Sequence, residues 1–160
     1  MTPLRLGKVP SGLGTADLFI TISEGDQPLL RVDLYGDTSS ESYVSQDVIV
    51  WREHVFVGCG HTVHVIEPKK QVGRTISLEG TCAYFSAFHA GPEYLLVVSG
   101  EGVLRLDPGG EVLWKASDLA IDGVTVESIE GGLIKGSGDW DPPGGYRPFV
   151  IRLDSGESVS

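Results

Sequence analysis

Two stretches of this sequence, His54–Val72 (HVFVGCGHTVHVIEPKKQV) and Tyr94–Val112 (YLLVVSGEGVLRLDPGGEV), align with each other at an offset of 40 residues. Each runs through an apolar segment, a glycine turn, a second apolar segment, an acidic-proline turn and a third apolar segment. The glycine turns coincide at Gly60 and Gly100. Self-similarity at a period of this length is typical of repeat architectures.

Two further copies of the pattern flank this pair. A later copy begins at Gly132–Gly138 and resumes at Phe149–Glu157, and a degenerate first copy covers Ala16–Gly36 with two apolar segments and a turn. The chain of 160 residues is therefore expected to form one domain of four approximate repeats. We place these repeats at residues 7–42, 43–82, 83–122 and 123–160.

Three of the copies begin with an additional apolar segment, namely Asp47–Trp51, Tyr84–Phe88 and Val124–Ile129. These segments are rich in β-branched and aromatic residues, and no stretch shows a helical pattern. The sequence predicts an all-β fold of about four repeats, each a four-stranded antiparallel meander. This arrangement is a small β-propeller or an open, propeller-like sheet.

Closure of such a ring is the open question, because an unclosed ring leaves edge strands exposed. The N-terminal segment Pro3–Leu6 is a candidate for the missing outer strand of the last repeat. Alternatively, two copies pair edge to edge, so both a monomer and a homodimer are considered.

The stretch Tyr94–Lys115 resembles the PQQ-like, or WD40-like, β-propeller repeat. The matching residues are Gly100, Asp107, Gly110 and Trp114. The resemblance is specific over this copy only, since Arg74 occupies the position of Trp114 in the preceding copy. Quinone-dependent dehydrogenases with blades similar to this one have a full ring of many blades around the cofactor, which a chain of 160 residues cannot supply. The resemblance therefore implies the blade, and we expect no cofactor.

The charge balance narrows the class of partner. The chain has 12 basic and 22 acidic residues, for a net charge of -10. This excess argues against nucleic acid and anionic membranes as partners. It suits a basic protein partner, but a negatively charged surface also serves solubility alone, which is the commoner reason for it. No apolar run is long enough for a membrane span, and the N-terminus has no signal-peptide pattern. With only Cys59 and Cys82, we expect reduced thiols and a cytoplasmic location.

Cys59, His61 and His64 form the most compact group of ligand-type residues. In the repeat alignment Cys59 and His61 fall at a turn, and His64 falls inside a strand. Residues three apart on a strand point to opposite faces, so His61 and His64 are not expected to converge. Their spacing is also not a recurrent zinc motif, although His54 or Cys82 could join them. We therefore expect no metal and interpret Cys59 as an apolar filler and the histidines as half-exposed.

The insertion Asp139–Pro148 (DWDPPGGYRP) interrupts the last repeat and is the best candidate for a functional site. Its prolines give the chain a preset path, and loops on a rigid scaffold often carry function. Trp, Tyr and Arg are enriched in binding hot spots. The predicted partner-binding residues are Asp139, Trp140, Asp141, Tyr146 and Arg147. The alternative interpretation is that Trp140 and Tyr146 form a lid and Arg147 pairs with Asp139 or Asp141.

Two classes of function follow from these features. The first is a non-catalytic module that binds a protein partner through the 139–148 loop and an acidic face; neutralisation of a basic toxin is one such role. The second is a small hydrolase or metal-dependent enzyme that uses Cys59, His61 and His64, or the pair Asp139 and Asp141. Because catalytic sites require converging groups and the sequence shows none, we favour the binding module.

Overall fold

The structure is a computed structural model, and it describes residues 2–12, 14–36, 45–80 and 83–160. These residues form strands, turns and irregular segments and contain no helix, so the prediction of an all-β fold is confirmed. The strands are β1 (Leu4–Gly7), β2 (Leu18–Glu24), β3 (Gln27–Tyr35), β4 (Gln46–Trp51), β5 (His54–Cys59), β6 (Thr62–Glu67), β7 (Val72–Ser77), β8 (Phe85–Ala90), β9 (Leu95–Ser99), β10 (Val103–Leu106), β11 (Val112–Ala116), β12 (Val124–Glu130), β13 (Leu133–Asp139) and β14 (Tyr146–Arg152).

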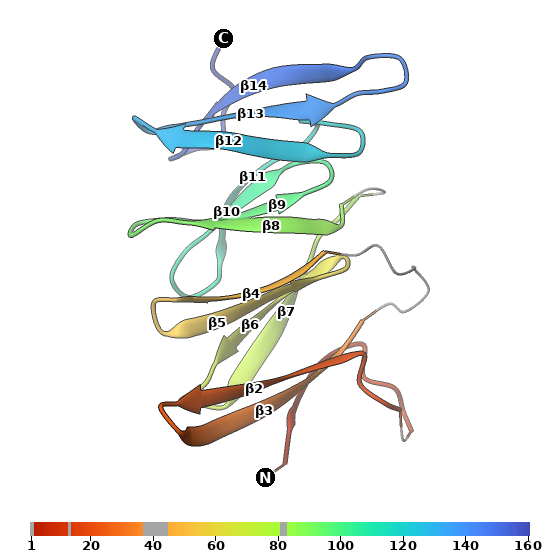
Figure 1. Ribbon diagram of the computed structural model, residues 1–160, viewed down its shortest axis with the longest axis vertical. Coiled ribbons are helices and arrows are strands. Elements are labelled where there is room, and N and C mark those ends of the chain that lie inside the picture. Colours follow the sequence, from red (N-terminus) through yellow and green to blue (C-terminus); the bar gives the residue numbers. More distant parts are fainter. Residues whose placement is uncertain (1, 13, 37–44, 81–82) are drawn as a thin grey trace.

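The strands build four separate sheets that follow one another along the chain. Their strand orders are β1-β3-β2, β4-β5-β6-β7, β8-β9-β10-β11 and β12-β13-β14. Figure 1 shows these sheets stacked along the longest axis of the molecule, with the first sheet at one end and the last sheet at the other. We refer to them below as the first to fourth sheets. The two central sheets have the predicted four strands, but among the described residues the two end sheets have three, so the prediction of a four-stranded meander in every repeat is wrong for these two.

Three apolar clusters lie between successive sheets and hold the stack together. One includes Val32 of the first sheet and Val57 of the second. The next packs Phe56 against Phe85 of the third sheet, and the last packs Leu96 against Ile134 of the fourth. All six of these side chains are fully buried, with an exposed fraction of 0%. Each central sheet is therefore apolar on both faces, which explains the nearly continuous apolar runs in its inner strands.

The N-terminal segment does not join the last sheet, so that prediction for Pro3–Leu6 is wrong. Instead β1 pairs in parallel with β3, and Leu6 lies opposite Leu34. Its side chain also packs on β7 of the second sheet, where a Cβ added at Gly73 would come within 2.8 Å of Leu6 Cδ1. β1 pairs with β3 because this position buries Leu6 in the apolar cluster between the first and second sheets.

Two tryptophans link neighbouring sheets by the same kind of hydrogen bond. Trp51 Nε1 donates to the Gly91 carbonyl at 2.9 Å, and Trp114 Nε1 donates to the Leu153 carbonyl at 2.9 Å. Each bond joins a strand to a segment about one repeat later in the chain. The indole thus combines apolar packing with a directed polar contact, which fixes how one sheet sits on the next.

Candidate functional site

The loop within the last repeat is shorter than the sequence analysis predicted. β13 extends to Asp139 and β14 begins at Tyr146, so Tyr146–Pro148 belong to a strand. Asp139 and Tyr146 lie opposite each other in the ladder between these strands. The expected ten-residue excursion is therefore a connection of residues 140–145. The strands continue because Arg147 and Pro148 each find a ladder position opposite β13.

Backbone hydrogen bonds close this connection on itself. Trp140 N donates to the Gly145 carbonyl at 2.8 Å, and Gly144 N donates to the Trp140 carbonyl at 2.9 Å. Asp141 N donates to Asp139 Oδ1 at 2.9 Å. Gly145 has a φ of +64°, in the left-handed region where a glycine is favoured. The loop consequently has a defined shape of its own.

The three predicted hot-spot side chains take different positions. The Arg147 guanidinium lies over the Trp140 ring, 5.4 Å from its centroid. Trp140 is half-buried, whereas Tyr146 is 75% exposed. Tyr146 therefore does not fold back as a lid, and Arg147 contacts the indole ring. The arrangement presents a phenol ring to solvent beside a stacked Trp–Arg pair.

An exposed isoleucine, which the sequence analysis missed, adds to this surface. Ile121 N donates to the Asp139 carbonyl at 2.8 Å, and the Ile121 side chain is 45% exposed. Asp139 in turn pairs with Tyr146, so one row across the end of the sheet holds Ile121, Asp139 and Tyr146. The neighbouring Asp122 accepts a hydrogen bond from the Tyr84 hydroxyl. No spacing pattern places Ile121 beside the loop, because the segment before β12 has no regular period.

The group at Cys59, His61 and His64 is arranged around the turn between β5 and β6. Cys59 ends β5, His61 lies in the turn, and His64 lies inside β6 as its alignment position predicts. The prediction of half-exposed histidines is wrong for His64, which is 1% exposed. Its ring is retained in the interior because Nδ1 pairs with Thr75 Oγ1 at 2.8 Å and Nε2 with Thr62 Oγ1 at 3.3 Å.

Burial shifts the pKa values of two side chains in this group, His64 and Cys59. Burial lowers the pKa of His64 to about 4, so its ring is neutral at physiological pH. Burial, together with the charge of Asp17, raises the pKa of the Cys59 thiol. A thiol with a raised pKa is a poor nucleophile. In the part of the chain that the structure describes, no three His, Cys, Asp or Glu side chains are placed to hold a metal ion. Cys82 lies outside the described residues.

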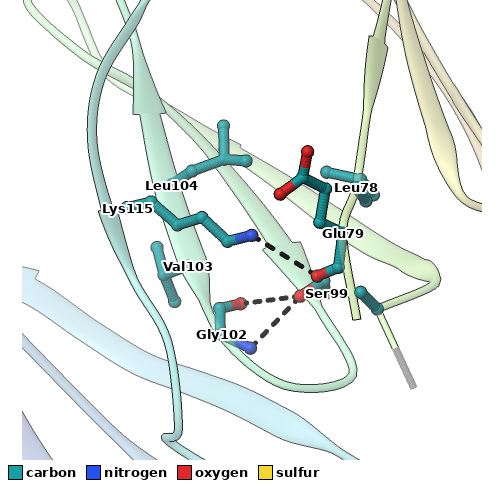
Figure 2. Close-up of a pocket in the computed structure, with 8 residues that line it drawn as sticks. Leu78, Glu79, Ser99, Gly102, Val103, Leu104 and Lys115 are labelled. Carbon is teal, nitrogen blue, oxygen red and sulfur yellow. Dashed lines mark hydrogen bonds between the residues drawn. The ribbon is translucent and has the colours of Figure 1, made fainter. Parts of the chain in front are cut away.

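A small cavity opens beside the third sheet. Figure 2 shows Lys115, Ser99 and Glu79 around it, with Leu78 and Leu104 forming part of its wall. Ser99 Oγ accepts a hydrogen bond from Gly102 N at 3.1 Å, and Lys115 Nζ donates to the Glu79 carbonyl at 3.4 Å. The cavity volume is about 10 Å³, which is enough for one water molecule at most. It is far too small for an organic substrate.

No protein-family model matches the chain, and a search of curated proteins finds no significant match. Among the described residues, no helix is long and apolar enough to cross a membrane.

Proposed function

We propose that this protein is a non-catalytic binding module that contacts a protein partner through the 139–148 loop. The observation that carries the proposal is the 75% exposure of Tyr146 beside a loop that its own backbone hydrogen bonds hold in shape. A rigid, exposed aromatic side chain loses little conformational entropy when it enters a pocket. Tyrosine is also one of the residue types that dominate binding energy at interfaces.

The surroundings of Tyr146 favour a basic partner. Ile121 supplies a second exposed apolar side chain, and Asp122, Asp139 and Asp141 place carboxylates around the row. Carboxylates at the rim of an interface steer a positively charged partner and disfavour an acidic one. A basic toxin that the module neutralises is one protein of this kind. The net charge of -10 strengthens the same preference at longer range.

We further propose that the stack is an open, propeller-like arrangement of PQQ-like repeats. The support is the match of Gly100, Asp107, Gly110 and Trp114 to the family's repeat pattern. The apolar contacts of the third sheet with both neighbouring sheets add to it. A binding role does not require ring closure, because the loop is anchored within the fourth sheet alone. The free thiol of Cys59 is compatible with a cytoplasmic location.

The test compares Tyr146→Ala with Leu113→Ala, which removes another exposed apolar side chain, 55% exposed on β11. Tagged protein is used to recover partners from its native cells, and the affinity of each recovered partner is then measured. We expect Tyr146→Ala to weaken binding by about tenfold or more, as for an interface hot spot, with Leu113→Ala unchanged. Equal retention of every partner by both variants would contradict the proposal.

Light scattering on wild type and Trp140→Ala separates an outside partner from self-association. A monomer in both cases supports the proposal. A dimer that Trp140→Ala dissociates would make the loop a self-association surface, and the proposal of an outside partner would then be wrong.

A further inference from the structure

The second sheet carries apolar side chains that its neighbour leaves uncovered. Val48 and Val50 of β4 are 46% and 70% exposed. They lie opposite Val57 and Val55 of β5, which are buried in the cluster beneath the first sheet. Directly opposed residues of an antiparallel pair share a face. Val48 and Val50 therefore face the first sheet but are not covered by it.

The equivalent strands elsewhere in the stack are covered. Phe85 of β8, the leading strand of the third sheet, is buried against the second sheet together with Trp51. Val124 of β12, the leading strand of the fourth sheet, is 5% exposed and packs against the third sheet. Among the three leading strands β4, β8 and β12, β4 alone exposes large apolar side chains on the face towards the preceding sheet.

Val48 and Val50 stay uncovered because the first sheet, with three strands, packs on the second sheet, which has four. β1 contacts β7, β3 is the central strand, and β2 is the strand at the other end of the first sheet. Ile20 and the other inward residues of β2 pack on the cluster that contains Val55 and Val57 of β5. None of the described strands pairs with the outer edge of β2, and one more strand at this edge would therefore lie over β4. Figure 1 shows β2 and β4 along the same side of the stack.

Acidic residues surround this uncovered position. They are Asp17 before β2, Glu24 and Asp26 at the turn after it, Asp47 on β4 and Glu53 at the turn after β4, and all five are exposed. The nearby Arg52 pairs with Glu93 at 3.7 Å. A second copy of this acidic chain would be repelled here, whereas Lys or Arg side chains would be attracted.

We propose that the free edge of β2 binds an extended, basic segment of a partner protein, which adds a fourth strand to the first sheet over Val48 and Val50. Main-chain hydrogen bonds to β2 supply part of the affinity, and alternate side chains select the segment. Apolar side chains at inward positions cover the two valines, and basic side chains at outward positions meet the carboxylates. This surface is separate from the 139–148 loop and does not depend on its proposed role.

The test uses a capped nine-residue peptide that alternates Val and Lys, with a matched peptide that carries Glu in place of Lys. Chemical shifts and amide exchange are followed by NMR as each peptide is added to the full chain. We expect the Lys peptide to shift the amides of β2 and β4 and to slow exchange along β2. The absence of any shift at about millimolar peptide, or equal binding of the Glu peptide, would overturn the proposal.

The matched variants are Val48→Thr with Val50→Thr, and Val72→Thr as the control. Threonine keeps the shape and the strand propensity of valine but removes apolar surface. Val72 is 50% exposed on β7, at the opposite edge of the same sheet. The double variant should bind the Lys peptide about tenfold more weakly, and the control should bind it like wild type. Equal weakening in both would overturn the proposed position. Dimerisation of the free chain that the double variant abolishes would identify a second copy as the occupant.

Discussion

The second and third sheets have the same strand order and aligned repeats, but they contact the following sheet through different side chains. In the third sheet, Trp114 packs its ring on Gly156, where an added Cβ would come within 2.5 Å of the ring. In the second sheet Arg74 holds the equivalent position and approaches Gly110 and the Gly109 carbonyl, at 3.4 Å from the latter. It also pairs with Glu111 at 3.3 Å.

The buried positions of the two sheets show the same kind of difference: the second sheet has a polar side chain where the third has an apolar one. His64 of β6 occupies the alignment position of Leu104 of β10, and the two are 1% and 6% exposed. The imidazole is accommodated because Thr62 and Thr75 hydroxyls meet its two nitrogens. The repeat thus fixes where a side chain lies, and the second sheet fills two of these positions with polar groups that require partners. Four substitutions test this difference, from the largest expected effect to the smallest.

Trp114→Ala should break the contact between the third and fourth sheets. It removes a large ring from the Gly156 turn and the hydrogen bond to the Leu153 carbonyl. We expect a loss of about 3 kcal/mol in the free energy of unfolding, at the lower end for a tryptophan because the ring is not fully buried. Urea unfolding measures this value. A loss below about 1 kcal/mol would show that the ring is not a main contact between these sheets.

His64 should make stability depend on pH. Its pKa is about 4 in the folded chain and about 6.5 in an unfolded one, so the fold favours the neutral ring. The stabilisation is complete above about pH 6.5 and is lost as the pH falls towards 4, by about 3 kcal/mol in total.

His64→Leu copies Leu104 and removes this dependence. Because it leaves the Thr62 and Thr75 hydroxyls without the ring, the variant should be less stable than wild type near pH 7.5. The difference should shrink or reverse near pH 4.5. Urea unfolding at both pH values provides the comparison, and parallel pH profiles for the two proteins would contradict the assignment.

Trp51→Phe isolates the hydrogen bond that links the second sheet to the third. Phenylalanine keeps most of the ring packing but leaves the Gly91 carbonyl without its indole donor. We expect a loss of about 1 kcal/mol in the free energy of unfolding. Trp114→Phe is the matched variant, because it removes the corresponding bond to Leu153. A much larger loss for Trp51→Phe would show that packing, and not the bond, distinguishes the two rings.

Arg74→Ala should have the smallest effect. Its ion pair with Glu111 joins side chains that are 42% and 74% exposed, and such pairs contribute little. We expect a loss of about 0.5 kcal/mol or less, which added salt reduces further. Thermal unfolding at low and high salt measures both values. A loss as large as that of Trp114→Ala would mean that the arginine replaces the tryptophan energetically as well as in position.

The candidate site was only partly visible in the sequence. Trp, Tyr and Arg in the inserted segment indicated a binding loop, and the structure exposes Tyr146 as a binding residue requires. The stacking of Arg147 on Trp140 and the position of Ile121 depend on strand pairing across the end of the fourth sheet. The loop boundaries also shifted, because ladder pairing extended both flanking strands beyond the apolar residues that had marked them.

The sequence by itself determined the all-β class, the repeat and the positions of most strands. These features depend on local properties: alternation, β-branched residues and turns at Gly60 and Gly100. Only the tertiary structure decided that β1 joins the first sheet in parallel, that His64 is buried, and that Val48 and Val50 are left uncovered. Each of these depends on which sheet lies against which, a contact between distant residues that no local pattern encodes.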